Sequence, residues 1–138
     1  MVVNIKTPRP PLNLFEVVRI GVTDEWTTIY DVPRYEIPAL GPTPLYYIET
    51  AAIMTGAIVS NTSVIPITVS ARILNAAGAP YTLLTDVQIP VGDYILLDVD
   101  RQVLKTAERL QLKCGTAQTA QAHFSFVLNQ REQFEVLP

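Results

Sequence analysis

Alternation of apolar and polar residues is the main regularity of the chain. Between positions 65 and 73 every odd position is apolar, while positions 68, 70 and 72 are polar, which is the period of two typical of a half-buried strand. The preceding segment, residues 48–60, is apolar on both parities. We interpret it as a more deeply buried strand, in which Gly56 marks a bulge or a close approach. The polar triplet Asn61-Thr62-Ser63 between the two segments predicts a short turn, and therefore a central hairpin.

The same alternation recurs along the rest of the chain and predicts roughly eight short strands separated by turns. Apart from the central hairpin, we expect strands at residues 14–24, 26–32, 81–89, 94–99, 108–114 and 121–128. Residues 100–104 could form one helical turn, capped by Asp100, which is too short to stand as a helix of its own. The sequence therefore predicts an all-β fold, an antiparallel two-sheet β-sandwich of the jelly-roll or immunoglobulin-like type.

Two proline-rich segments interrupt this pattern. Residues 1–13 contain three prolines that forbid a helix, so we expect an extended N-terminal arm. At about 3.1 Å per residue the arm would span roughly 40 Å, which is more than the roughly 35 Å width of a compact domain of this size. The alternative is an arm that lies along its own sheet edge or is disordered.

The second segment, residues 33–45, holds four prolines and is expected to be a long surface loop, because proline cannot donate to a strand ladder. The expected organisation is therefore an arm at residues 1–13, a sandwich domain at residues 14–129 and a short polar C-terminal tail at residues 130–138.

Composition narrows the class of partner. The chain has 138 residues, of which 49% are hydrophobic and 17% charged, and its formal net charge is -3, so a globular domain without a basic surface for nucleic acid is expected. No apolar run is long enough for a membrane span or a signal peptide, so no membrane partner is expected. A mean hydropathy of +0.24 suggests apolar surface that another subunit covers, although a large core would explain the same value.

Residues with catalytic or metal-binding chemistry are sparse. His123 is the single histidine and lies on the polar parity of its strand, so we expect a solvated side chain. The single cysteine, Cys114, lies on an apolar parity, where burial makes a thiol inert. Three acidic residues close to one turn could bind calcium, but are expected to be solvated caps: Asp93, Asp98 and Asp100. We expect neither an enzyme nor a cofactor or metal.

Two further patterns allow a functional interpretation. Asn61-Thr62-Ser63 matches the N-glycosylation acceptor, which turns supply by chance because all three residues favour turns. Aromatic residues could form a platform for stacking sugars, although in strands they more often belong to a core or an interface: Trp26, Tyr30, Tyr35, Tyr46 and Tyr47.

Four short motifs carry a resemblance to a known family. They are Thr27-Thr28-Ile29-Tyr30-Asp31-Val32-Pro33, Ile58-Val59-Ser60-Asn61-Thr62-Ser63, Ile89-Pro90-Val91-Gly92-Asp93 and Tyr94-Ile95-Leu96-Leu97. Over Val22 to Leu128 the chain resembles small virion structural proteins of tailed bacteriophages. The resemblance implies one β-sandwich that serves as a capsid cement or decoration protein, or as a neck or tail component. The chain departs from the family pattern at residues 34–45 and 103–108, which leaves the place in the virion open.

The resemblance also implies partners and a location. We expect contacts with the major capsid protein or other virion subunits and with further copies of the chain, in a virion assembled after synthesis in a bacterial cytoplasm. The arm and the proline-rich loop are the expected contact regions, and their partner-binding residues are Ile5, Pro8, Arg9, Pro10, Pro11, Leu12, Tyr35, Leu40, Pro42 and Leu45. The alternative function is a receptor- or carbohydrate-binding module at a tail tip, which would use Trp26 and the loop tyrosines.

Overall fold

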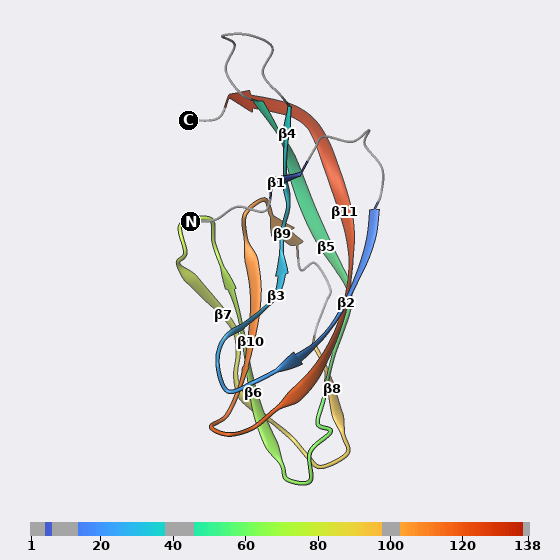
Figure 1. Cartoon of the computed structure of the whole chain (residues 1–138), viewed down its shortest axis with the longest axis vertical. Helices are drawn as coiled ribbons and strands as arrows, with labels where there is room; N and C mark the ends of the chain where they lie inside the picture. Colours follow the sequence, from blue (N-terminus) through green and yellow to red (C-terminus); the bar gives the residue numbers. More distant parts are fainter. Residues whose placement is uncertain (1–4, 7–13, 38–45, 98–102, 137–138) are drawn as a thin grey trace.

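Two antiparallel sheets packed face to face form the body of the molecule (Figure 1). The computed structural model describes residues 5–6, 14–37, 46–97 and 103–136, and the side chains of residues 15–33, 50–97 and 103–129. Within these residues the chain contains strands and turns and no helix. The predicted fold class, an all-β antiparallel sandwich, is confirmed.

The large sheet has β5 at its centre. It contains β1 (Ile5–Lys6), β4 (Arg34–Ile37), β5 (Tyr46–Ser60), β11 (Ala120–Val136), β2 (Leu14–Val22), β8 (Tyr94–Leu96) and β9 (Val103–Lys105). One edge of β5 pairs with β11, which in turn pairs with β2. The other edge of β5 is covered in succession by β4, β9 and β8. All of these pairs are antiparallel, whereas β1 adds to β4 in parallel.

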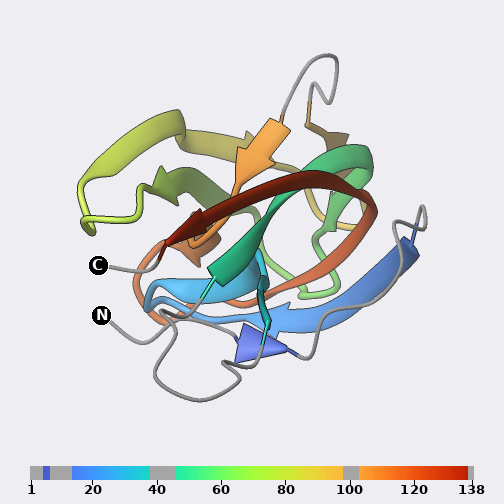
Figure 2. The ribbon, with the colours of Figure 1, turned by 90° about the horizontal axis from the view of Figure 1, so that it is seen from above.

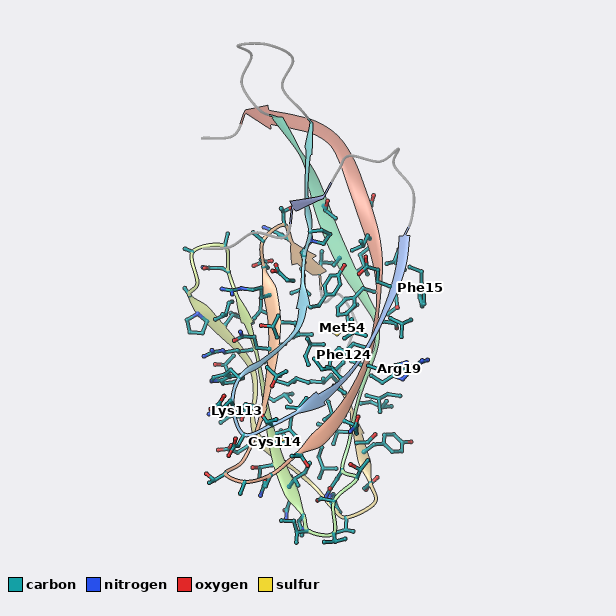
Figure 3. All side chains as sticks on the ribbon, viewed as in Figure 1. Phe15, Arg19, Met54, Lys113, Cys114 and Phe124 are labelled. Atoms are coloured by element: carbon teal, nitrogen blue, oxygen red, sulfur yellow. The ribbon has the colours of Figure 1, made fainter. Side chains whose placement is uncertain are left out.

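The small sheet covers the inner face of the large one. Its strands, in spatial order, are β3 (Thr27–Asp31), β10 (Arg109–Cys114), β6 (Ile67–Leu74) and β7 (Pro80–Ile89). Side chains from both inner faces form one core, in which Phe124 and Phe126 of β11 are fully buried. Tyr30 of the small sheet stacks on Phe126 with ring centroids 4.3 Å apart. Figure 3 shows Phe124 and Met54 in the space between the two sheets.

The predicted central hairpin is wrong. β5 and β6 belong to different sheets, so the segment from Asn61 to Pro66 crosses from one layer to the other. The apolar faces of the two strands therefore meet across the core instead of lying side by side. Residues that favour turns serve either connection equally well, and the pairing of β5 with β11 decides between them.

The bulge at Gly56 is confirmed, while the expected deep burial of β5 is not. Gly56 pairs with Ser125 and Met54 with Phe126, so Thr55 is an extra residue in β5. A Cβ atom on Gly56 would lie 2.6 Å from the Ser125 Oγ, which also makes this the predicted close approach. The extra residue switches the inward parity of β5 from even to odd positions, which explains why apolar residues occupy both parities.

The proline-rich loop is shorter than expected. Residues Arg34–Ile37, which lie between Pro33 and Pro38, form β4 and pair with β5. Four residues free of proline are enough for a short strand, because each flanking proline lies outside the ladder. Residues 38–45 lie outside the described part of the chain.

Three other segments also differ from the expectation. Residues 103–105, which overlap the last two residues of the segment 100–104 expected to make a helical turn, form β9. The strand β11 runs on to Val136, so most of the expected C-terminal tail is part of a strand, in which Gln130 and residues 134–136 pair with β5. In the expected arm, Ile5 and Lys6 pair with Arg34 and Tyr35 of the same chain, as in the alternative of an arm along its own sheet edge.

Candidate partner-binding surface

Two rows of side chains cross the outer face of the large sheet, because the strand register places residues far apart in the sequence side by side. The first row runs from β2 over β11 and β5 to β9 and is wholly apolar: Phe15, Val127, Ile53 and Val103. The second row runs from β2 to β8: Arg19, His123, Ile58 and Leu96. We call the apolar members of these rows, together with Val17 and Tyr94, the outer apolar face.

Much of the outer apolar face is open to solvent. Phe15 is 64% exposed, Leu96 67% and Val103 47%, and Val17 beside Phe15 is 44% exposed. Figure 3 shows Phe15 and Arg19 projecting from β2 away from the small sheet. Single exposed apolar side chains are ordinary on a protein surface, but an apolar row across four strands indicates a surface that another molecule covers.

A second apolar cluster lies at the end of the sandwich where the β5–β6 crossing meets the β7–β8 turn. Val64 of the crossing is 90% exposed, and Ile65 and Val91 are each about half exposed. Asn61 joins these two connections. Its side-chain amide donates to the carbonyls of Ile65, Ile89 and Pro90, at 2.8, 3.1 and 3.2 Å.

The outer face of the small sheet has a different character. A chain of polar contacts crosses it: Gln111 donates to the Thr28 hydroxyl at 3.1 Å and accepts from the Arg72 Nε at 2.9 Å. The Arg72 guanidinium carbon lies 3.9 Å from the centroid of the Trp26 ring, and the Lys113 ammonium lies 5.0 Å from it. Trp26 is thus already in contact with two cations of its own chain, which leaves less of its ring for a sugar.

The candidate catalytic and metal-binding residues that the structure describes lie apart from one another. His123 is exposed on the outer face of the large sheet, beside Arg19 and Ile58. Cys114 is buried in the core, and burial raises the pKa of its thiol to about 11, with a further contribution from the negative charge of Asp24. Among the described residues there is no group of His, Cys, Asp and Glu side chains that could hold a metal ion.

The acceptor asparagine of the glycosylation pattern is a structural residue. Asn61 is 2% exposed, and its amide hydrogens point at backbone carbonyls within the protein. A glycan on this nitrogen has no room in the folded state. The turn chemistry of Asn61-Thr62-Ser63 therefore explains the pattern.

Two open depressions meet at one end of the sandwich and share Asn75 and Glu108 in their walls. The larger, of about 390 Å³, also borders Tyr81 and Val103. The two shared polar side chains are engaged within the chain: the Asn75 Oδ1 accepts from the backbone of Ala77 and of Ala79. The Glu108 Oε1 accepts from the backbone of Lys105.

The structure describes only part of the predicted partner-binding set. Ile5 lies in β1 opposite Arg34, and Tyr35 lies in β4 opposite Ile48. The remaining members are outside the described residues: Pro8, Arg9, Pro10, Pro11, Leu12, Leu40, Pro42 and Leu45. That set stays a prediction.

The outer apolar face is absent from the predicted set. Its signal is present in the sequence, because the segments that became β2 and β5 carry apolar residues on both parities. In residues 48–60 this pattern predicts burial on both sides, as is typical of the strands of parallel sheets. In an antiparallel sandwich the same pattern leaves one apolar parity facing outward.

The chain was compared with known proteins in sequence. No protein-family model matches it, and no curated protein matches it either. Within the described parts of the chain no helix is long and apolar enough to cross a membrane.

Proposed function

We propose that the protein is a structural component of a bacteriophage virion, a cement or decoration protein that binds the capsid shell through the outer apolar face of its large sheet. Neighbouring shell subunits are the expected partners. A position in the neck or tail is the alternative, since the same surface would serve there.

The outer apolar face is the observation that supports this proposal. Burying a fully exposed Val, Leu or Phe side chain contributes about 1.5–3 kcal/mol. For residues that are already partly covered, such as Leu96 and Val103, roughly 1 kcal/mol each remains to be gained on binding. Several such residues on one rigid face can therefore hold a partner through the burial of apolar surface alone. A rigid sheet also loses little entropy on docking.

Binding to capsids tests the proposal. The full chain is mixed with purified tail-free capsids of the virus whose genome encodes it, and the bound fraction is measured by co-sedimentation. Leu96→Glu and Val103→Glu place a charge in the dry centre of the interface, so each should weaken binding at least tenfold. Thr82→Glu is the matched control, because Thr82 is also an exposed strand residue but belongs to the small sheet.

Two results would contradict the proposal. One is equal binding by the wild type, both face variants and the Thr82 variant. The other is the finding that the gene for this chain lies outside any viral genome. If the chain binds complete particles but not tail-free capsids, electron microscopy of labelled particles will place it at the neck or the tail.

The receptor- or carbohydrate-binding alternative has less support. It relies on Trp26 and the loop tyrosines, yet Arg72 already covers the Trp26 ring. Of the other aromatic residues considered for a sugar-stacking platform, Tyr30 is stacked in the core. A glycan array with the full chain separates the two functions, since the cement function predicts no sugar signal.

A further inference from the structure

Two cations share one aromatic ring on the outer face of the small sheet. The Arg72 guanidinium carbon lies 3.9 Å and the Lys113 ammonium 5.0 Å from the centroid of the Trp26 ring. Arg72 of β6 is opposite Gln111 of β10, so Arg72 and Lys113 are diagonal neighbours on the sheet. Figure 3 shows Lys113 on the side of the molecule opposite Arg19, and Figure 2, viewed from above, shows β7 of the small sheet (yellow-green) on the opposite side from β2 (blue). The two like charges are therefore held close together, away from the outer apolar face.

A buried amide fixes the position of Arg72. Gln111 is 7% exposed. Its Oε1 accepts from the Arg72 Nε at 2.9 Å, and its Nε2 donates to the Thr28 hydroxyl at 3.1 Å. The orientation of the amide is determined by this pairing, because a guanidinium N–H can only donate. Gln111 and the Trp26 ring thus hold the guanidinium in place before any ligand arrives.

Several donors of this cluster have no acceptor within the described part of the chain. They are the two terminal nitrogens of the Arg72 guanidinium and the Lys113 ammonium. Among the residues that the structure describes, no carboxylate forms an ion pair with either cation. Both side chains are half-buried, so each charge is less screened by water than a fully exposed one. An anion that contacts both cations would therefore be attracted more strongly than by two isolated surface charges.

We propose that this cluster binds carboxylate groups of an acidic segment on a further partner protein, through the terminal nitrogens of Arg72 and the ammonium of Lys113. The two terminal nitrogens of a guanidinium match the two oxygens of a carboxylate in a bidentate pair, and the ammonium adds a less directional donor. A bound carboxylate also offsets the repulsion between the two cations. The inference goes beyond the function proposed above, because it concerns the other sheet and a different chemistry.

The surroundings favour a carboxylate on a protein over other anions. Neither of the two open depressions described above is lined by residues of this cluster, and Thr28 within it is exposed. Small molecules usually bind in concave sites, so an anionic group on the surface of a larger partner fits this face better. A nucleic acid is a poorer fit, since two cations on a chain with a net charge of -3 do not make the basic surface that a phosphate backbone needs.

Acidic residues of the chain near the cluster limit its affinity. Asp86 lies on the same sheet face, where it accepts from the hydroxyl of Ser70, the residue opposite Lys113. Asp24 and Glu25 are exposed just before β3. These charges weaken the attraction of a distant anion, so binding depends on close contact with the two cations. The expected affinity for a short acidic peptide is therefore modest.

The single tryptophan of the chain reports binding at this site. Trp26 has the only indole N–H, which gives one NMR signal that can be followed during a titration of the full chain. The probe is an acetylated and amidated tetraglutamate peptide, and the corresponding tetraglutamine peptide is its uncharged control. Only the glutamate peptide should shift the Trp26 signal. Its Kd should rise at least threefold between about 20 and about 200 mM NaCl, because salt screens the contact.

Two substitutions in the cluster and one outside it separate binding from packing. Arg72→Lys keeps the charge but loses the planar fork, so the peptide should bind at least fivefold more weakly. Lys113→Gln removes one charge and leaves the Arg72 contact with Trp26, and should weaken binding at least threefold. Arg19→Gln is the matched control, because it removes one positive charge from an exposed residue of the large sheet; its Kd should change less than twofold. A purely structural role of the two cations would change stability in urea but not the Kd.

Three outcomes would overturn the inference. One is an unshifted Trp26 signal with the glutamate peptide at about 10 mM. Another is equal affinity of the wild type, Arg72→Lys and Lys113→Gln for the peptide. The third is tighter binding of inorganic phosphate than of the peptide, lost in the same two variants, which would assign the cluster to a phosphate group. No capsid is present in these experiments, so their failure leaves the capsid-binding proposal untouched.

Discussion

Replacement of Asn61 should cost more stability than any other change of a polar residue in the loops at this end of the sandwich. Asn61 is 2% exposed and ties the β5–β6 crossing to the β7–β8 turn. Its side-chain nitrogen donates to three backbone carbonyls, and its Oδ1 accepts from the Ser63 backbone at 2.9 Å. Its own backbone N–H donates to the Asp93 carbonyl at 2.9 Å. The partners determine the amide orientation, because carbonyls only accept and a backbone N–H only donates.

The expected loss follows from these contacts. Each hydrogen bond contributes about 1 kcal/mol net, and a buried carbonyl left without a donor costs about 1–3 kcal/mol more. Asn61→Ala removes the side-chain hydrogen bonds and leaves the buried Ile89 carbonyl without the hydrogen bond that Asn61 donates. The free energy of unfolding should therefore fall by about 3 kcal/mol. For a chain of this length the unfolding entropy is roughly 290 cal/mol/K, so the melting temperature should fall by about 10 °C.

Urea and thermal unfolding followed by circular dichroism measure this change. Asn75→Ala is the matched control, since Asn75 also bonds two backbone groups through its Oδ1 but is exposed. Water replaces those bonds, so the control should lose about 1 kcal/mol or less. Equal losses for the two variants, or a loss below about 1 kcal/mol for Asn61→Ala, would refute the reasoning.

Asn61→Asp refines the test, because it keeps the shape of the side chain and removes only the donors. A carboxylate oxygen then faces the three carbonyls, so at pH 7 the variant should be less stable than Asn61→Ala. The folded state raises the pKa of the new carboxyl, since only the protonated form can donate. The stability gap between the variant and the wild type should therefore narrow as the pH falls towards 4.

Three further predictions concern the core and the two outer faces. Gly56→Ala should cost about 1–2 kcal/mol, because its Cβ would lie 2.6 Å from the Ser125 Oγ; a double variant with Ser125→Ala should recover most of that loss in urea unfolding. The Cys114 thiol, with its pKa raised to about 11, should react with a thiol reagent only after unfolding, and stability should fall as the pH rises from about 9 to 11, since the unfolded thiol ionises first. Arg72→Ala should change the fluorescence of Trp26, whose ring it covers, and cost about 1 kcal/mol, whereas unchanged fluorescence would contradict the contact.

The existence of most strands could be predicted from the sequence, because a period of two is a local property. The sheet to which each strand belongs could not. The turn residues after Ser60 allow a hairpin or a crossing equally well. What decides is the pairing of β5 with β11, whose partners are separated by more than 60 residues along the chain. Non-local pairing of this kind leaves no mark in the turn itself.

The position of the candidate surface was missed for a related reason. Phe15, Val127, Ile53 and Val103 lie in one row only because three separate registers align them. No local pattern contains all four. The bulge at Gly56 further hides the row, because it switches the inward parity within β5 and makes an outward apolar residue resemble a buried one.

The difference between the two outer faces of the sandwich indicates that the protein binds its partner through the large sheet. The small sheet carries polar contacts and cations on its outer face. Its edge strand β7 is interrupted by two irregularities in its pairing with β6. The large sheet carries the outer apolar face. An exposed apolar row is unfavourable in water, and its presence on the large sheet is explained if a partner covers it. A complex in which the partner contacts only the small sheet would leave Phe15 and Leu96 in solvent, and would contradict this explanation.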